Sequence, residues 1–74
     1  MMPLAMVEAG QNVTVVSFCG GLNVRKRLID LGLTHGLMIR VLRRDTQGPI
    51  IIAVKDSRLA LGRGIVHKIM VEPC

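Results

Sequence analysis

The sequence predicts a small, mainly β barrel of about five strands, with one helix inserted between the first two strands. Short apolar segments rich in β-branched residues recur between turn-forming Gly, Pro, Asn and Asp residues, which is typical of strands. Helical periodicity occurs in the segment 20–36. Closing short strands into a barrel removes exposed sheet edges that would otherwise aggregate. The expected strands are residues 13–19, 37–44, 50–54, 58–61 and 69–71.

The helix is expected to begin at Asn23, whose side chain would cap the free N–H groups of the first turn after the flexible Gly20-Gly21 pair. At about 100° per residue, five aliphatic side chains fall on one half of the helix, which predicts that this half packs on the barrel. Lys26 and Arg27 lie on the other half, and Arg25 lies at the margin of the apolar half. The five aliphatic residues are Leu22, Val24, Leu28, Ile29 and Leu31.

Two glycines predict how the helix ends. Gly32 suits the left-handed position of a Schellman motif, in which Leu33 would contact Leu28. Gly36 suits the positive-φ position of a type II turn over residues 34–37, which would lead the chain into the next strand.

The apolar pattern of the remaining segments predicts which faces are buried. In residues 37–44, Leu37, Ile39 and Val41 point one way, which predicts a half-buried strand. Residues 50–54 are apolar on both faces, so this strand is either fully covered or has an apolar outer face. Residues 1–9 are expected to form a short helical flap over the core, with Pro3 in its first turn.

Length and composition indicate one domain that spans residues 1–74. Ten Lys and Arg residues against five Asp and Glu give a net charge of +5, which favours an acidic partner, although such a charge also serves solubility. The sole aromatic residue is Phe18, so the core is expected to be aliphatic. Two cysteines are too few for a disulfide scaffold.

The chain is expected to be cytoplasmic and not to insert into a membrane. Residues 1–10 lack the basic start and the long apolar segment of a signal peptide. The longest apolar run, residues 50–54, is far shorter than the roughly 20 residues that cross a bilayer.

Several short motifs follow one another along the chain in an order and spacing that are typical of a known family. A Gly-Gly pair, the basic triplet 25–27, the run Leu-Ile-Asp-Leu-Gly-Leu at 28–33 and a Thr-x-Gly turn at 34–36 follow one another. In this order and spacing they resemble the FeoA family, the small cytosolic proteins of bacterial ferrous iron transport. The resemblance implies an SH3-like barrel with helical insertions. Further motifs at residues 3–4, 9–11, 41–44, 58–61 and 69–73 extend it over nearly the whole chain.

The resemblance implies a non-enzymatic accessory protein that binds and modulates FeoB, the membrane iron transporter that carries a cytosolic GTP-binding domain. Homo-oligomers are compatible with this function. One alternative is a regulatory or metal-responsive module, because barrels of this type also resemble the C-terminal domain of iron-dependent repressors. Another is a small barrel that binds nucleic acid without sequence preference.

Exposed basic residues are the predicted contacts with such a partner. The family has been suspected of GTPase-activating behaviour, for which Arg25, Arg27 or Arg58 would be the candidate arginine finger. A basic triplet on a helix is also common as a simple solvated face. The predicted partner-binding residues are Arg25, Lys26, Arg27, Arg40, Arg43, Arg44 and Arg58.

No cofactor is expected, and the sequence leaves metal binding undecided. None of the candidate ligands forms a CxxC or HxxxH pair, although a site across the barrel or between protomers stays open. His35 stands where FeoA sequences commonly have Pro, which implies a looser turn. The candidate ligands are Cys19, His35, His67, Glu72 and Cys74.

Three other classes are disfavoured. No nucleophile lies in a catalytic signature and the five acids are scattered, so an enzyme is not expected. A single Phe cannot form a stacking platform for bases or an aromatic groove for Pro-rich ligands, so nucleic-acid contacts would be limited to phosphates. The glycines of 20–21 and 62–64 lack the Lys-Ser/Thr of a phosphate-binding loop and are interpreted as turns.

Overall fold

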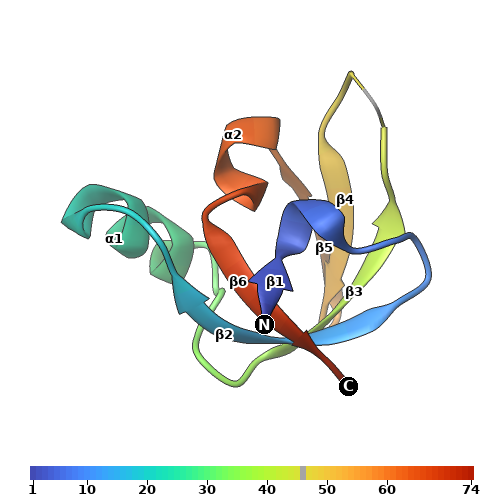
Figure 1. Cartoon of the computed structure of the whole chain (residues 1–74), viewed down its shortest axis with the longest axis horizontal. Coiled ribbons are helices and arrows are strands. Elements are labelled where there is room, and N and C mark those ends of the chain that lie inside the picture. The colour runs from blue at the N-terminus through green and yellow to red at the C-terminus, as the bar shows by residue number, and fades with distance from the viewer. Residues whose placement is uncertain (46) are drawn as a thin grey trace.

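The computed structural model describes residues 1–45 and 47–74. In that part of the chain, six strands form one antiparallel sheet in the order β1-β6-β2-β3-β4-β5, which curls around an aliphatic core (Figure 1). The strands are β1 (Met2–Pro3), β2 (Asn12–Phe18), β3 (Met38–Arg43), β4 (Ile50–Val54), β5 (Ser57–Leu61) and β6 (Ile69–Pro73). The helical segments are η1 (Leu4–Met6), α1 (Leu22–Asp30) and α2 (Arg63–Val66). The predicted small, mainly β fold with a helix between the first two long strands is therefore confirmed.

The N-terminal segment covers the core, as expected, but through a strand and a 3-10 turn. Met2 and Pro3 pair with Val71 and Met70 of β6, which adds a sixth strand that the sequence did not predict. A proline is tolerated there because β1 is an edge strand. Pro3 is the N-cap of η1 and does not lie in its first turn, and the flap buries Leu4 completely.

The interior consists of aliphatic side chains, and within the described residues no polar or charged side chain is buried. Alternate residues of each long strand point inward, as the pleat requires. Phe18 packs against this core but is only half-buried. The buried residues are Leu4, Val7, Val13, Val15, Leu28, Leu33, Ile39, Val41, Ile50, Ile52, Val54, Leu61, Val66, Ile69 and Val71.

The end of α1 follows the prediction. Gly32 has φ +93°, the N–H of Leu33 donates to the carbonyl of Leu28 at 3.0 Å, and the N–H of Gly32 donates to Ile29 at 2.9 Å. These two bonds define a Schellman motif, and both Leu28 and Leu33 are fully buried. The next turn is confirmed too, since the N–H of Leu37 donates to Thr34 at 3.1 Å and Gly36 has φ +85°.

The prediction for the start of α1 was wrong. The N-cap is Gly21, and no side chain caps the helix. Gly20 has φ +124° and Gly21 is extended, so the chain is already helical at Leu22. Asn23 consequently lies inside the first turn, beyond the position from which its side chain could cap the helix.

The predicted apolar face of α1 is also only partly buried. Leu28 is buried and Val24, one turn earlier, is half-buried, but Leu22, Ile29 and Leu31 are 84%, 52% and 40% exposed. The nine-residue helix meets the narrow barrel along one line of contact, and residues i and i+4 are those that share such a line. Three large aliphatic side chains therefore face water.

The outer faces of β3 and β4 agree with the alternation in the sequence. Ile39 and Val41 are buried, whereas Met38 on the other face of β3 is exposed. In β4 the outer residues Ile51 and Ala53 are half-buried, so this strand has an apolar outer face and is not fully covered.

Substitutions at two leucines of α1 test whether Leu28 faces the barrel and Leu22 faces water. Leu28→Ala should lower the free energy of unfolding by about 2–5 kcal/mol, because it removes methyl groups from a closed core. Leu22→Ala should change it by no more than about 0.5 kcal/mol, because Leu22 is exposed. Urea denaturation followed by circular dichroism measures both variants, since the chain lacks Trp and Tyr. Equal losses would mean that α1 packs on the barrel through another face.

Candidate functional site

The seven basic residues predicted to bind a partner are all exposed, but they do not form one surface. The triplet 25–27 lies on α1, which projects from one side of the barrel, and Arg43 and Arg44 lie at the β3–β4 hairpin on the opposite side of the view (Figure 1). The structure therefore offers separate basic areas that distinct variants can test. The arginine-finger role of Arg25, Arg27 or Arg58 stays a prediction.

The first area is the outer face of β3, β4 and β5. Arg40 is registered opposite Ala53, and Ala53 is opposite Arg58. Because directly opposed side chains lie about 4.5–5.5 Å apart at Cβ, the two arginines flank a small alanine. Arg43 is opposite Ile51 in the next row. We call this area the β3–β5 face; it presents three cations over an apolar floor, and no carboxylate shares these rows.

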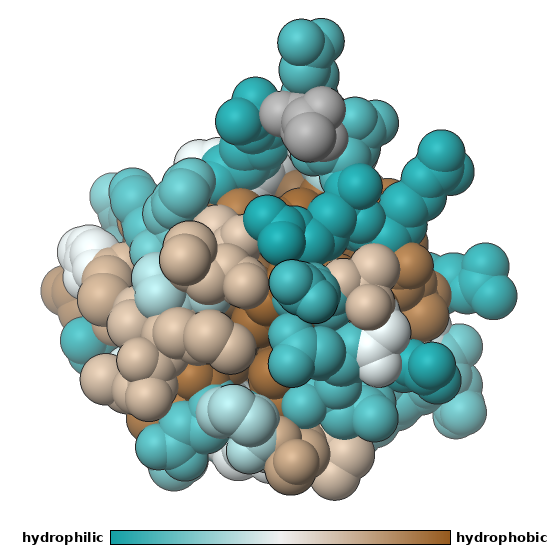
Figure 2. All heavy atoms as spheres, turned by 45° about the vertical axis from the view of Figure 1, so that its right-hand side comes forward, coloured by the Kyte–Doolittle hydropathy of each residue, from teal (hydrophilic) through white to brown (hydrophobic). Residues whose placement is uncertain are grey.

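Apolar surface adjoins this charged surface. In Figure 2, hydrophilic side chains gather around the β3–β4 hairpin at the top of the view, whereas the lower left is mostly apolar. Such a mixed surface suits contact with a protein, because interfaces combine apolar contact with charged rims.

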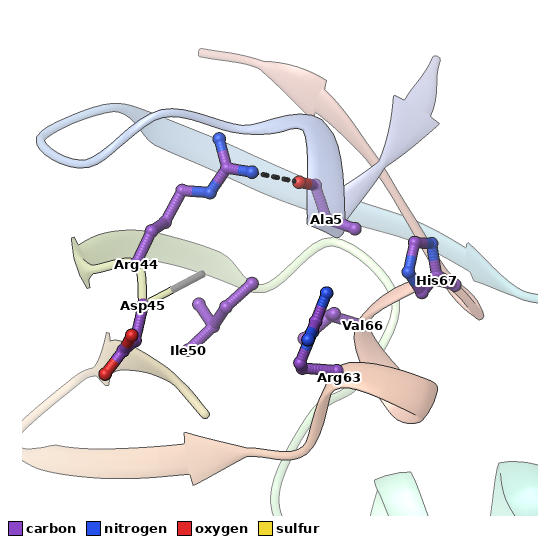
Figure 3. A pocket seen from close by; sticks show the side chains of 7 residues that line it. All are labelled: Ala5, Arg44, Asp45, Ile50, Arg63, Val66 and His67. Carbon is purple, nitrogen blue, oxygen red and sulfur yellow. Dashed lines mark hydrogen bonds between the residues drawn. The ribbon is translucent and has the colours of Figure 1, made fainter. Parts of the chain in front are cut away.

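The second area is a hollow of about 280 Å³ between η1, the end of β3 and α2 (Figure 3). Arg44 donates from Nη2 to the carbonyl oxygen of Ala5 at 2.8 Å, which ties the N-terminal segment to the end of β3. Arg63 and His67 line the same hollow. The carboxylate of Asp45 accepts the N–H of Gln47 at 3.2 Å and points away from Arg63 in Figure 3. Arg44 therefore has a structural contact besides its predicted role in binding.

The third area lies between α1 and the segment 62–68. A hollow of about 390 Å³ is lined by the aliphatic residues Val24, Leu28 and Ile65, by the cations Arg27 and Lys68, and by Gly62 and Gly64. We call it the α1–α2 groove. The sequence pointed to Arg27 but missed Lys68, and the two glycines were interpreted as turns. In the structure Gly64 lies inside α2, where glycine lowers stability relative to alanine.

The candidate metal ligands do not converge within one chain. Among residues 1–45 and 47–74, no group of three His, Cys, Asp or Glu side chains is positioned to hold a metal ion. His35 lies in the turn before β3 and His67 follows α2, while Cys74 Sγ lies 3.2 Å from Thr14 Oγ1. A protein zinc site takes three or four ligands. A site shared between protomers stays a prediction.

The helical segments of this protein are short. None of those in the described part of the chain is long and apolar enough to cross a bilayer.

The fold defines the class of the protein as an SH3-like barrel. The structure matches FeoA of Stenotrophomonas maltophilia, which is described as a prokaryotic SH3 domain protein complexed with zinc, with a TM-score of 0.83 and 22% identity over 97% of this chain and 91% of that one. It also matches a manganese-dependent transcriptional repressor with a TM-score of 0.88 and 22% identity, over 97% of this chain and 41% of the repressor. At this identity the likeness concerns the fold alone, and it confirms the predicted relation to repressor domains.

The sequence places the chain in a particular family within this class. The family model of the FeoA domain matches residues 2–73, so the chain belongs to the FeoA family. A candidate Fe(2+) transport protein A of Methanocaldococcus jannaschii is 40% identical over 72 residues, which are 97% of this chain and 87% of that protein. The crystal structure of an iron uptake regulatory protein (FeoA) matches with a TM-score of 0.92 and 40% identity, over 99% of this chain and 97% of that one.

The dispersed ligands predict weak metal binding. The isolated monomer should bind ferrous iron or zinc only weakly, because no three ligands of one chain are in place, and metal bound in crystals should join protomers through His or Cys. Anaerobic calorimetry on a sample of verified monomer measures this, with Cys74→Ser as a control that should change little. A stoichiometric, submicromolar site in the monomer would contradict the prediction.

Proposed function

We propose that this protein is a non-enzymatic accessory protein of ferrous iron uptake, which acts in the cytoplasm by binding the cytosolic part of the transporter FeoB and modulating it. Membership of the FeoA family over residues 2–73 is the observation that carries the proposal. The names of two relatives, one for Fe(2+) transport and one for regulation of iron uptake, support it.

The charge distribution supports recognition of an acidic protein surface. The net charge is +5, and the cations stand on the outside of a core that contains aliphatic side chains. Complementary charge raises the rate at which two proteins associate and fixes their orientation, and salt screens the effect. Phosphate contacts alone would be equally salt-sensitive, but the surface offers no aromatic platform for bases.

The burial pattern supports a binding role over catalysis. Acid–base catalysts usually depend on titratable groups whose environment is partly desolvated. The described titratable side chains of this protein are exposed, and the two hollows beside its basic residues are open to solvent. These features are typical of a domain that acts by binding another protein.

Two pairs of charge reversals test the proposal and locate the contact. Lys26→Glu/Arg27→Glu changes α1, and Arg40→Glu/Arg58→Glu changes the β3–β5 face by the same net charge. The pair that lies in the interface should slow association with the purified cytosolic domain of the transporter by roughly tenfold or more and weaken its salt dependence. Both pairs should leave the free energy of unfolding within about 0.5 kcal/mol of the parent for each exposed site.

Association is measured at low and high salt and in each nucleotide state of the partner, with melting curves alongside. If the parent protein binds neither the cytosolic domain nor the solubilised transporter in any of these conditions, the proposal fails. If the parent binds and neither pair alters the rate, the basic surfaces are solvated faces and the contact is apolar.

A further inference from the structure

Helix α1 exposes an unusual amount of aliphatic surface for so short a helix. Leu22, Ile29 and Leu31 all face water although the helix has nine residues. Single exposed leucines are common, but several on one element suggest a surface that is covered by something else. These three side chains lie near the basic triplet 25–27 in the sequence, so apolar surface and positive charge occur on the same helix.

Two hollows beside α1 have room for a partner; Leu31 lines one of them, whereas Leu22 and Ile29 line neither. The α1–α2 groove runs beside Val24 and Leu28, with Ile65 on its other wall. A second hollow, of about 410 Å³, lies at the C-terminal end of α1 and is lined by Leu31 and, across it, by Leu59 of β5. Aliphatic side chains thus line both hollows from the first turn of α1 to its end.

Gly62 and Gly64 keep the α1–α2 groove open. Neither has a positive φ, unlike Gly32 and Gly36, so their backbone geometry does not call for glycine. A Cβ atom added at either position would meet no atom within 4 Å, so close packing does not call for glycine either. Glycine in a helix costs about 0.5–1 kcal/mol relative to alanine, and Gly64 lies within α2. Glycine at position 64 therefore weakens α2 locally, and the missing side chains at both positions leave space in the groove.

The charges around the groove indicate its occupant. Arg27 and Lys68 stand on opposite sides of an aliphatic floor, and no acidic residue lines the groove. An acidic segment with aliphatic side chains complements both features. A second copy of this chain is a poor match because it also carries a net charge of +5, and a Pro-rich segment would need aromatic walls.

We infer that the α1–α2 groove binds an acidic protein segment that carries aliphatic side chains, which seat between α1 and Gly64 while Arg27 and Lys68 pair with its carboxylates. The inference deepens the proposed function. It rests on that function for one point, namely that the acidic segment belongs to the cytosolic part of the transporter. Of the three basic areas, the α1–α2 groove is then the one that contacts the partner, and the β3–β5 face is not part of that contact.

A small probe tests the groove without the transporter. 1-Anilinonaphthalene-8-sulfonate is an apolar anion, and its fluorescence rises on binding, so it should report the groove directly. Gly64→Leu, which fills the groove, and Arg27→Glu/Lys68→Glu, which reverses its charges, should each weaken probe binding at least tenfold. Arg40→Glu/Arg58→Glu is the matched control, since it changes the net charge equally but lies outside the groove, and it should bind the probe like the parent.

Melting curves exclude an effect of unfolding, and Gly64→Leu should melt no lower than the parent because its side chain enters open space. Equal probe binding by the parent and Gly64→Leu would overturn the inference. An equal loss in both charge-reversal pairs would do the same, because it would show attraction to net charge alone.

The transporter's cytosolic domain then tests the source of the segment. Gly64→Leu should weaken its binding at least tenfold. If the parent and Gly64→Leu bind that domain equally, the groove inference fails while the proposed function stands. If the probe results hold but the parent does not bind the domain, the proposed function fails, and the groove is a site for another acidic segment.

Discussion

The structure depends on filling a barrel interior with aliphatic side chains alone. Every element except β1 contributes at least one fully or nearly fully buried residue, down to single residues such as Leu28 of α1 and Val66 of α2. Branched side chains have few rotamers and interdigitate closely, so such an interior tolerates no buried polar group and little change in volume. Because a chain of 74 residues has no spare core, the short helical segments and the N-terminal flap belong to the same interior as the strands.

This interior leaves the outer surfaces to carry recognition. With the core closed, all ten Lys and Arg side chains are exposed, and seven of them lie in the three areas described above. Helix α1 shows most clearly which residues fill the core and which remain on the surface. Leu28 and the Schellman bonds to Leu33 anchor its C-terminal half to the barrel, and the side chains around the rest of the helix remain free to meet a partner. A protein built this way acts through its surface, and the α1–α2 groove is the part of that surface where a partner's side chain has room to enter.

The turns and strand faces followed from local chemistry, and so the sequence predicted them well. Gly32 and Gly36 have the positive φ values that their positions in the sequence suggested, and β4 has the predicted bounds Ile50–Val54. The basic character of the surface was likewise predictable, because charged side chains avoid a small aliphatic core. The N-cap of α1 was not, since the chain turns at Gly20 and the N-cap lies at Gly21, two residues before the predicted Asn23.

The sequence by itself thus determined the fold class, the faces of the strands, the end of α1 and the excess of positive charge. These depend on side-chain periodicity and on backbone preferences within a few residues. Only the tertiary structure decided how much of the apolar half of α1 would be buried, which cations would share a surface, and that Lys68 would stand across a groove from Arg27. Those outcomes depend on where the barrel brings together residues far apart in the chain. A helical wheel shows that a side is apolar, but how much of it is covered is set by the width of the surface that it meets.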